Sequence, residues 1–294
     1  MRLRARAPGK VNLCLFLGGP RGDGRHELVT LFESVSVADE LSMSVSRVVR
    51  DEVACAGVEG PNLALGALTE LRERGWGAPA VRVEIEKRIP IAGGMGGGSA
   101  DAAAVLRMAT ELAPGRPEEV VEIASSLGAD VPSQLAPGLV LGTGAGEIIE
   151  PVPAIAPHAL VIVPQPSRLS TADVYREADR LGLPRGPEQL EALLDELRSS
   201  LAKGQGLAPE LLANDLEPAA VSLCPGISRA LDGIRVTGAE KAFVCGSGPT
   251  AAGLYWGHDG IERAIAAAES LVKRFPGAIS AVPVTAEYGS PEFA

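Results

Sequence analysis

A loop of unusual glycine density constrains this chain more than any other feature of its sequence. Residues 93–98 hold five glycines and one methionine. Glycines permit positive-φ turns that point several backbone N–H groups toward one place, which forms a cradle for an anion. The alternating pattern of residues 81–87 predicts a strand before the loop, and residues 99–112 predict a helix after it. The helix N-terminus would add its dipole and its free N–H groups there, so the sequence favours a phosphate-binding loop over a plain turn.

Common phosphate-binding motifs do not fit this loop. A Walker A loop requires a lysine that the loop lacks, and Ser99 stands where a dinucleotide fingerprint needs its third glycine. A second segment, Gly246–Ala251, formally fits the dinucleotide pattern after a strand, which keeps an oxidoreductase as an alternative. Strand-like residues rather than a helix follow it, and Pro249 removes a donor, so this alternative is disfavoured.

Charge and composition narrow the range of partners. The 27 basic residues (Lys and Arg) against 37 acidic ones give a net charge of −10, which disfavours nucleic acid and anionic membranes. The apolar residues at 11, 13, 15 and 17 would share one face of a strand, and Asn12 interrupts any reading of this region as a signal peptide. Four scattered cysteines and three histidines lack disulfide or metal-ligand spacing. We therefore expect a cytoplasmic protein without nucleic-acid or membrane partners.

The length of 294 residues is typical of two domains, and prolines at 151, 153, 157 and 164 predict a boundary there. We expect one domain over residues 1–152 and another over residues 153–294. The other predicted elements are a strand–turn–strand unit over 1–45 with its turn at 18–24, helices over 62–71, 117–127, 171–181 and 187–202, and strands over 159–163, 241–244 and 251–256. Because strands and helices do not alternate regularly, this order favours an α+β fold over a doubly wound α/β fold.

Two charged residues are candidates for catalysis. Lys10 stands inside an otherwise apolar strand, and Asp130 follows a predicted helix at a position where we expect burial. Phosphoryl transfer needs charge neutralisation and usually a base, which a lysine and an aspartate supply. Taken singly, each residue has a simpler explanation. Lys10 would protect the edge of a sheet, and Asp130 would occupy a turn or a helix cap.

Together with the glycine loop, these residues belong to a series of segments that resembles the GHMP kinase superfamily in order over nearly the whole chain. The segments are APGKVNL at 7–13, DGRHEL at 23–28, PIAGGMGGGSADAA at 90–103, GADVP at 128–132, NDLE at 214–217 and GSGPT at 246–250. The resemblance implies a two-domain α+β fold, with a ribosomal protein S5 domain 2-like, ATP-binding N-terminal domain and a ferredoxin-like, substrate-binding C-terminal domain. It implies a monomer or weak homodimer that uses ATP and Mg²⁺ to phosphorylate the 2-hydroxyl of 4-diphosphocytidyl-2-C-methyl-D-erythritol, in the non-mevalonate route to isoprenoids.

The same resemblance implies roles for individual residues. Asp130 would accept the hydroxyl proton, Lys10 would stabilise the developing charge, and Ser99 would lie near Mg²⁺. The implied ATP-binding residues are Asn62, Lys87, Pro90, Gly93, Gly94, Met95, Gly96, Gly97, Gly98, Ser99 and Ala100. The implied substrate-binding residues are Asn12, Arg25, His26, Asp130, Thr171, Tyr175, Gly246, Ser247 and Gly248. Without the resemblance, His26 would be a solvated loop residue and Tyr175 would equally well be an aromatic on the apolar face of a helix.

The chain departs from the family pattern at two places. Arg25 stands where the family usually has an aromatic residue, and Ser133 and Gln134 stand where bulky apolar residues are usual. We expect both places near the substrate cavity, where they would bear on substrate identity. The alternatives are another GHMP kinase (of mevalonate, homoserine or a sugar), which the segment at 23–28 disfavours, and a non-catalytic nucleotide-binding relative. The latter predicts loss of Lys10 or Asp130, and both are present.

Overall fold

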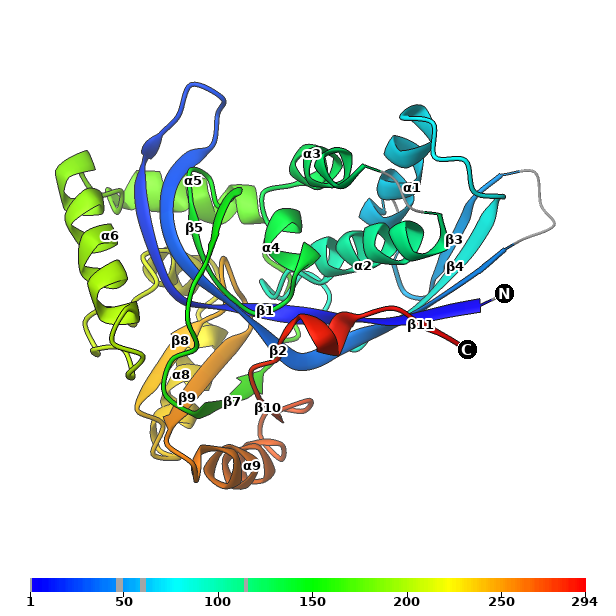
Figure 1. Ribbon diagram of the computed structural model, residues 1–294. Coiled ribbons are helices and arrows are strands. Elements are labelled where there is room, and N and C mark those ends of the chain that lie inside the picture. Colours follow the sequence, from blue (N-terminus) through cyan, green and yellow to red (C-terminus); the bar gives the residue numbers. More distant parts are fainter. Residues whose placement is uncertain (1, 46–49, 59–61, 114–115) are drawn as a thin grey trace.

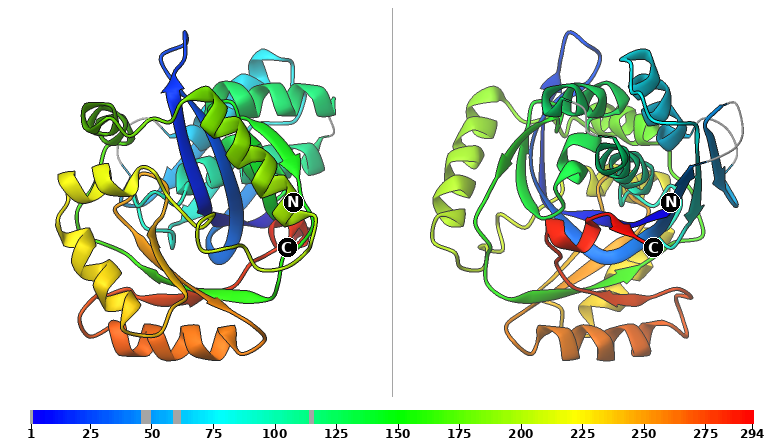
Figure 2. Two further views of the ribbon diagram at one scale, coloured as in Figure 1. Left: turned by 90° about the vertical axis from the view of Figure 1, so that its left-hand side faces the viewer. Right: turned by 45° about the vertical axis from the view of Figure 1, so that its right-hand side comes forward.

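The computed structural model describes residues 2–45, 50–58, 62–113 and 116–294. Two β-sheets lie in separate layers (Figure 1), and helices α1 to α4 pack on the face of the first sheet that points away from the second. Helices α8 and α9 cover the outer face of the second sheet. The two ends of the described chain lie side by side on the first sheet (Figure 2).

The first sheet is built mainly from a long antiparallel pair, β1 and β2, and its path runs β11-β1-β2-β4-β3. Strand β5 also pairs with β2, and β6 pairs with β5. Only the β3–β4 pairing is parallel among the described strands. The strands are β1 Arg2–Pro20, β2 His26–Val45, β3 Glu52–Cys55, β4 Val81–Glu86, β5 Leu139–Thr143, β6 Ile148–Pro151 and β11 Glu292–Phe293. The helices above them are α1 Leu63–Glu73, α2 Gly97–Leu112, α3 Pro117–Leu127 and α4 Val131–Leu135.

The second sheet is antiparallel throughout, in the order β10-β7-β9-β8. Both of its faces are buried. On β7, Leu160 and Ile162 pack into the core of the first sheet. The alternate residues Ala159, Val161 and Val163 pack into the second core, with the outer helices. Its strands are β7 His158–Val163, β8 Lys241–Val244, β9 Ala251–Trp256 and β10 Ile279–Ala281. The helices of this half are α5 Thr171–Leu181, α6 Pro187–Leu201, α7 Glu217–Leu223, α8 Gly226–Arg235 and α9 Gly260–Leu271, followed by the short 3₁₀ helix η1 Ala286–Gly289.

Strand β1 does not keep one face, so the prediction that residues 11, 13, 15 and 17 share a face is wrong. The register shifts between Asn12 and Cys14, where β1 carries one extra residue opposite β2. Such a bulge exchanges the two faces of a strand. Val11 and Leu13 therefore pack in the core of the first sheet, and Leu15 and Leu17 pack in the core of the second. This exchange lets one strand contribute to both cores.

The C-terminal strand of the chain lies beside its N-terminal strand. Strand β11 pairs with β1 at Leu3 and Arg4. The guanidinium of Arg107, on α2, donates to the carbonyl oxygens of Gly289 (3.1 Å) and Arg6 (2.9 Å) and also to that of Gln134 on α4.

The two sheets and their helices confirm the predicted α+β fold class. The division of the chain into two domains at residue 152 stays a prediction. Among the described residues, no helix is long and apolar enough to cross a membrane.

A buried ion pair joins the two sheets and predicts a pH dependence of stability. His158 on β7 contacts Glu33 on β2 through Nε2 at 2.6 Å, and both side chains are almost inaccessible. Burial opposes the charge of His158, but the hydrogen bond and the negative charge of Glu33 outweigh it and raise its pKa above the ordinary 6.5. The pair therefore stabilises the fold fully below about pH 6.5 and loses this contribution as the pH rises through the raised pKa.

We expect the free energy of unfolding of the wild type, relative to the neutral Glu33→Gln/His158→Gln double variant, to fall by about 1 kcal/mol or more between about pH 6 and pH 9. Urea unfolding at several pH values measures it. The exposed His258, changed to Gln, is the matched control and should leave the pH profile unchanged. A constant difference between wild type and double variant over this range would contradict the assignment.

Candidate active site

A cavity of about 980 Å³ lies between the two halves of the molecule. Its size suits a bound small molecule. The first half lines it with β1, the loop before α2 and the N-terminus of α1, and the second half lines it with α5 and the loop after β8. Every site residue expected from the sequence lines this cavity except Ala100, which is buried in α2 and donates its N–H to the carbonyl of Gly96 (2.8 Å).

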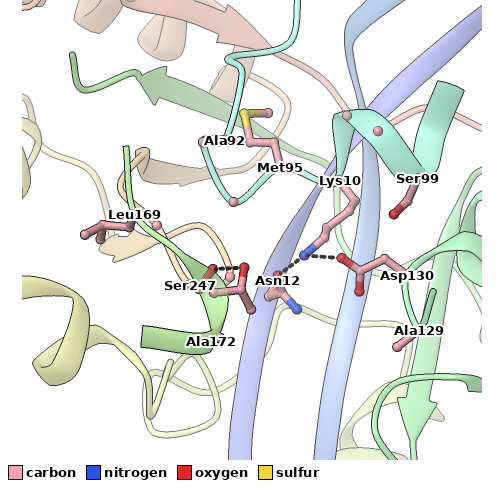
Figure 3. A pocket seen from close by; sticks show the side chains of 18 of the residues that line it. Lys10, Asn12, Ala92, Met95, Ser99, Ala129, Asp130, Leu169, Ala172 and Ser247 are labelled. Atoms are coloured by element: carbon pink, nitrogen blue, oxygen red, sulfur yellow. Dashed lines mark hydrogen bonds and ion pairs between the residues drawn. The ribbon is translucent and has the colours of Figure 1, made fainter. Parts of the chain in front are cut away.

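Lys10 occupies the centre of the cavity wall, where it projects from β1 toward Asp130 (Figure 3). Its Nζ lies 3.4 Å from Oδ2 of Asp130 and donates to Oδ1 of Asn12 at 2.8 Å. The amide of Asn12 is oriented in turn, because its Nδ2 donates to Thr30 (2.7 Å), whose hydroxyl donates to a β1 carbonyl. Lys10 is therefore a buried cation in a fixed place and not a solvent-facing residue at a sheet edge.

Asp130 lies at the N-cap position of α4, a helix of only five residues. Its side chain is 35% exposed, so the expectation of burial is wrong. The exposed part faces the cavity, because Asp130 lines it. Phosphate and an acceptor hydroxyl can thus reach the carboxylate, which a fully buried group would not allow.

Two glycine-rich loops from the two halves meet at Lys10. The N–H of Lys10 donates to the carbonyl of Met95 (2.9 Å), which attaches the first loop to β1. A Cβ added at Gly96 would lie 3.1 Å from the Lys10 stem, and one added at Gly246 would lie 3.2 Å from its Nζ. Gly94 has a φ of +80° and packs against the second loop, where an added Cβ would lie 2.0 Å from the Cys245 carbonyl oxygen. Part of the glycine density therefore serves contact between the two loops, a role that differs from the phosphate binding expected from the sequence.

Asn214 holds the second loop in place, a role that the sequence did not reveal. Its Nδ2 donates to the carbonyls of Val244 (2.8 Å) and Gly246 (2.7 Å), and its Oδ1 accepts from Leu216 (2.9 Å). The backbone of Asn214 forms an isolated parallel β-bridge with Leu15 on β1. The loop that follows β8 is thus tied to the strand that carries Lys10. Strand β9 and not a helix follows this loop, which removes the structural basis of the oxidoreductase alternative.

Lys87 lines the cavity, but its charge is already shared between two carboxylates. Its Nζ donates to Asp101 at 2.8 Å and also to Asp39. Burial opposes its charge, and the two carboxylates outweigh burial, so its pKa is raised. No role was predicted for Asp101, which ends the glycine-rich segment. An acidic residue in the first turns of the helix after such a loop is the signal that could have identified it.

At the other end of the cavity, His26 and Tyr175 face each other with ring centroids 5.1 Å apart. His26 is buried and pairs with Asp179 (2.8 Å), so it is not a solvated loop residue. Burial, followed by the charge of Asp130, raises the pKa of Tyr175. The hydroxyl groups of Thr171 and Ser247 form a hydrogen bond, with 3.1 Å between their oxygens, which joins α5 to the second glycine-rich loop.

The two departures from the family pattern lie in different places. Arg25 lines the cavity and is held by Asp23 at 2.9 Å. Ser133 and Gln134 are buried in α4 and do not themselves line it, although they lie within four residues of Asp130, which does. The Ser133 hydroxyl donates to the Asp130 carbonyl (2.8 Å) and thereby supports the turn that presents Asp130.

The contacts of the first loop predict that its glycines differ in their tolerance to substitution. Gly94→Ala should lower the free energy of unfolding by about 2 kcal/mol or more, because the new Cβ meets backbone atoms in a positive-φ conformation. Gly98→Ala should change it by less than about 0.5 kcal/mol, since its Cβ would meet only Leu63 at 3.6 Å. Urea unfolding of the two variants measures the contrast, and equal stabilities would contradict the packing role of Gly94.

Comparison with known proteins agrees with the geometry. Residues 62–138 match the family of GHMP kinases N terminal domains, and residues 188–274 match that of GHMP kinases C terminal domains. The chain is 39% identical to the 4-diphosphocytidyl-2-C-methyl-D-erythritol kinase of Streptomyces avermitilis over 89% of this chain and 91% of the relative. It is 42% identical to the protein of the same name from Mycolicibacterium gilvum over 84% and 80% of the two chains.

Solved structures give the same result. A crystal structure of a 4-(cytidine 5′-diphospho)-2C-methyl-D-erythritol kinase is 34% identical and superposes with a TM-score of 0.74, covering 95% of this chain and 98% of that chain. A homoserine kinase from Cytophaga hutchinsonii is 18% identical, with a TM-score of 0.68 over 99% and 96% of the two chains, and so shares the fold alone. The two-sheet fold, the family matches over both parts of the chain and these relatives place the chain among the GHMP kinases, in the family of the 4-diphosphocytidyl-2-C-methyl-D-erythritol kinases.

Proposed function

We propose that this protein transfers the γ-phosphoryl group of ATP to the 2-hydroxyl of 4-diphosphocytidyl-2-C-methyl-D-erythritol. The observation that carries the proposal is the ion pair of Lys10 and Asp130, at 3.4 Å, where two glycine-rich loops meet in one cavity. The relatives from Streptomyces avermitilis and Mycolicibacterium gilvum are named as kinases of this acceptor. We extend the activity to this chain because its cavity brings together a carboxylate, a fixed cation and a glycine-rich loop.

In the proposed reaction, Asp130 accepts the proton of the acceptor hydroxyl as its oxygen attacks the γ-phosphorus. The bond from that phosphorus to the bridging oxygen breaks, and ADP leaves with the electron pair. Lys10 donates to the equatorial oxygens, on which negative charge is spread. Because Asn12 and Thr30 already hold the ammonium and the amide in place, little reorganisation is needed at the moment of transfer.

ATP fits the end of the cavity formed by the first loop and the N-terminus of α1. Gly96 is the N-cap of α2, so the free N–H groups of the first turn open into the cavity together with the helix dipole. Asn62 caps α1 through its Oδ1, which accepts from Ala64 (2.9 Å) and leaves its Nδ2 as a donor. We assign the triphosphate to the loop and the adenosine to the space beside Asn62.

The residues present fit Mg²⁺ held mainly by phosphate oxygens and water. No cluster of three or more His, Cys, Asp or Glu side chains suited to a metal occurs in the described part of the chain. Mg²⁺ in kinases commonly takes one or two protein ligands together with substrate phosphates. Ser99, which lines the same cavity, is the residue that would hold it, and when bound it would neutralise charge on the phosphates.

We assign the cytidine to the opposite end, between His26, Tyr175 and Arg25. Tyr175 supplies a ring for stacking, and a guanidinium can stack on a base or pair with a diphosphate. We further propose that the protein acts in the cytoplasm as a monomer or weak homodimer.

Asp130→Asn should reduce kcat by roughly 10²-fold to 10⁴-fold, because the amide cannot accept the hydroxyl proton. The affinity for ATP should change by less than about threefold, since the glycine loop is unaltered. A coupled ADP-release assay and direct nucleotide titration measure the two quantities. The exposed Asp195, changed to Asn, is the matched control, and retention of full turnover by Asp130→Asn would remove Asp130 as the base.

The acceptor is tested by the same assay with four substrates. We expect turnover with 4-diphosphocytidyl-2-C-methyl-D-erythritol to exceed that with mevalonate, homoserine or galactose by a factor of about 10³ or more in kcat/KM, because only the first fills the end of the cavity at Tyr175. A preference for any of the other three would overturn the proposed acceptor and leave the kinase chemistry in place.

A further inference from the structure

One guanidinium group connects the strand that carries Lys10 to the helix that follows Asp130. Arg107, on α2, is partly buried, and each of its three side-chain nitrogens donates to a backbone carbonyl oxygen. The acceptors are Gln134 on α4, Arg6 on β1 (2.9 Å) and Gly289 on η1 (3.1 Å). Helix α2 packs against both α4 and β1 (Figure 1). A planar guanidinium has its N–H groups in a rigid fork, so it fixes these acceptors relative to one another.

On one side, Arg107 supports the helix that presents Asp130. Helix α4 has only five residues and begins directly after Asp130. A helix of this length is not stable by itself, and its last carbonyl groups have no partner within the helix. The guanidinium satisfies the carbonyl of Gln134 and places a positive charge near the C-terminus of α4, where a cation is favourable. Burial lowers the pKa of Arg107 to about 10, so it is charged at neutral pH.

On the other side, Arg107 holds β1 close to Lys10. The register of β1 against β2 shifts between Pro8 and Lys10, so regular pairing is interrupted directly before the lysine. The Arg6 carbonyl accepts from Arg107 before this shift, and the Lys10 N–H donates to the Met95 carbonyl (2.9 Å) after it. Helix α2 and the loop before it therefore hold β1 on both sides of the shift.

The third acceptor of Arg107 is itself held in place. The Tyr288 hydroxyl on η1 donates to the Ser36 carbonyl on β2 (2.8 Å), and its ring centroid lies 4.9 Å from the guanidinium carbon of Arg6. The next residue, Gly289, approaches the guanidinium of Arg107 closely. A Cβ added at Gly289 would lie 3.0 Å from Nη2 of Arg107, so a side chain there would push on the guanidinium.

We propose that Arg107 is a positioning residue for phosphoryl transfer, which fixes the Asp130 carboxylate relative to the Lys10 ammonium without contacting a substrate. Arg107 is not part of the cavity lining. It acts through Gln134 and Arg6, which lie four residues after Asp130 and four residues before Lys10. This inference rests on the proposed function.

Arg107→Met tests the proposal, because it removes the guanidinium and keeps an apolar stem. In the coupled ADP-release assay its kcat should fall roughly 10-fold to 100-fold, while KM for ATP and for the acceptor should change by less than about threefold. Hydrogen exchange should increase more in residues 128–136 than in the rest of the chain. Arg263→Met is the matched control, because Arg263 donates to the carbonyls of Trp256 (3.2 Å) and Gly238 (3.0 Å) outside the cavity. Its kcat should stay within about twofold of the wild type.

Gly289→Ala tests the same contact with Arg107 retained. The new Cβ should displace the guanidinium and lower kcat by about threefold or more. In the double variant Arg107→Met/Gly289→Ala, kcat should lie within about 1.5-fold of that of Arg107→Met, because the effect at Gly289 requires the guanidinium.

A wild-type kcat in folded Arg107→Met, an equal loss of kcat in Arg263→Met, or losses that multiply in the double variant would overturn the assignment. If Arg107→Met does not fold, Gly289→Ala decides the question, and a wild-type kcat in that variant contradicts the role of Arg107. A wild type that transfers no phosphoryl group would instead contradict the proposed function. Hydrogen exchange over residues 128–136 requires no turnover, so the two failures are distinguishable.

Discussion

The ammonium group of Lys10 is the point at which the two halves of this molecule depend on each other. A buried cation is stable only with close partners, and Asn12 and Asp130 provide them. Both glycine-rich loops approach Lys10 so closely that a side chain at Gly96 or Gly246 would contact it. The loops can meet there only because neither carries a Cβ. The proposed catalytic centre and the contact between the halves are therefore one structure.

The elements that carry the site are tied together away from the cavity as well. Asn214 fixes the second loop to β1, and Arg107 joins α2, α4, β1 and η1 through backbone carbonyls. Arg6 lies four residues before Lys10, and Gln134 lies four residues after Asp130. Such connections restrict the movement of Lys10 relative to Asp130, and preorganisation of this kind is what phosphoryl transfer requires.

Elements with clear periodicity could be predicted, and so could the four-residue strand β8, but several other short elements could not. The helices at 62–71 and 171–181 and the strand at 81–87 occur close to their expected positions. Short elements such as β3, α4 and β10 carry too few residues for a periodic pattern, and neighbouring chain stabilises them. The start of α2 at Gly97 was also missed, because glycine has low helix propensity and only the tertiary contacts of the loop place it in a helix.

The sequence by itself determined the chemistry: which residues can cradle phosphate, neutralise charge and accept a proton, and in what order they occur. Those properties belong to residue types and to local backbone freedom, so they are present before folding. Only the tertiary structure decided how the residues act on one another. It brought Lys10 to Asp130 across 120 residues of chain, exchanged the faces of β1 at a bulge and kept Gln134 out of the cavity lining. Burial and long-range contact have no local signature, because they arise from packing between distant segments.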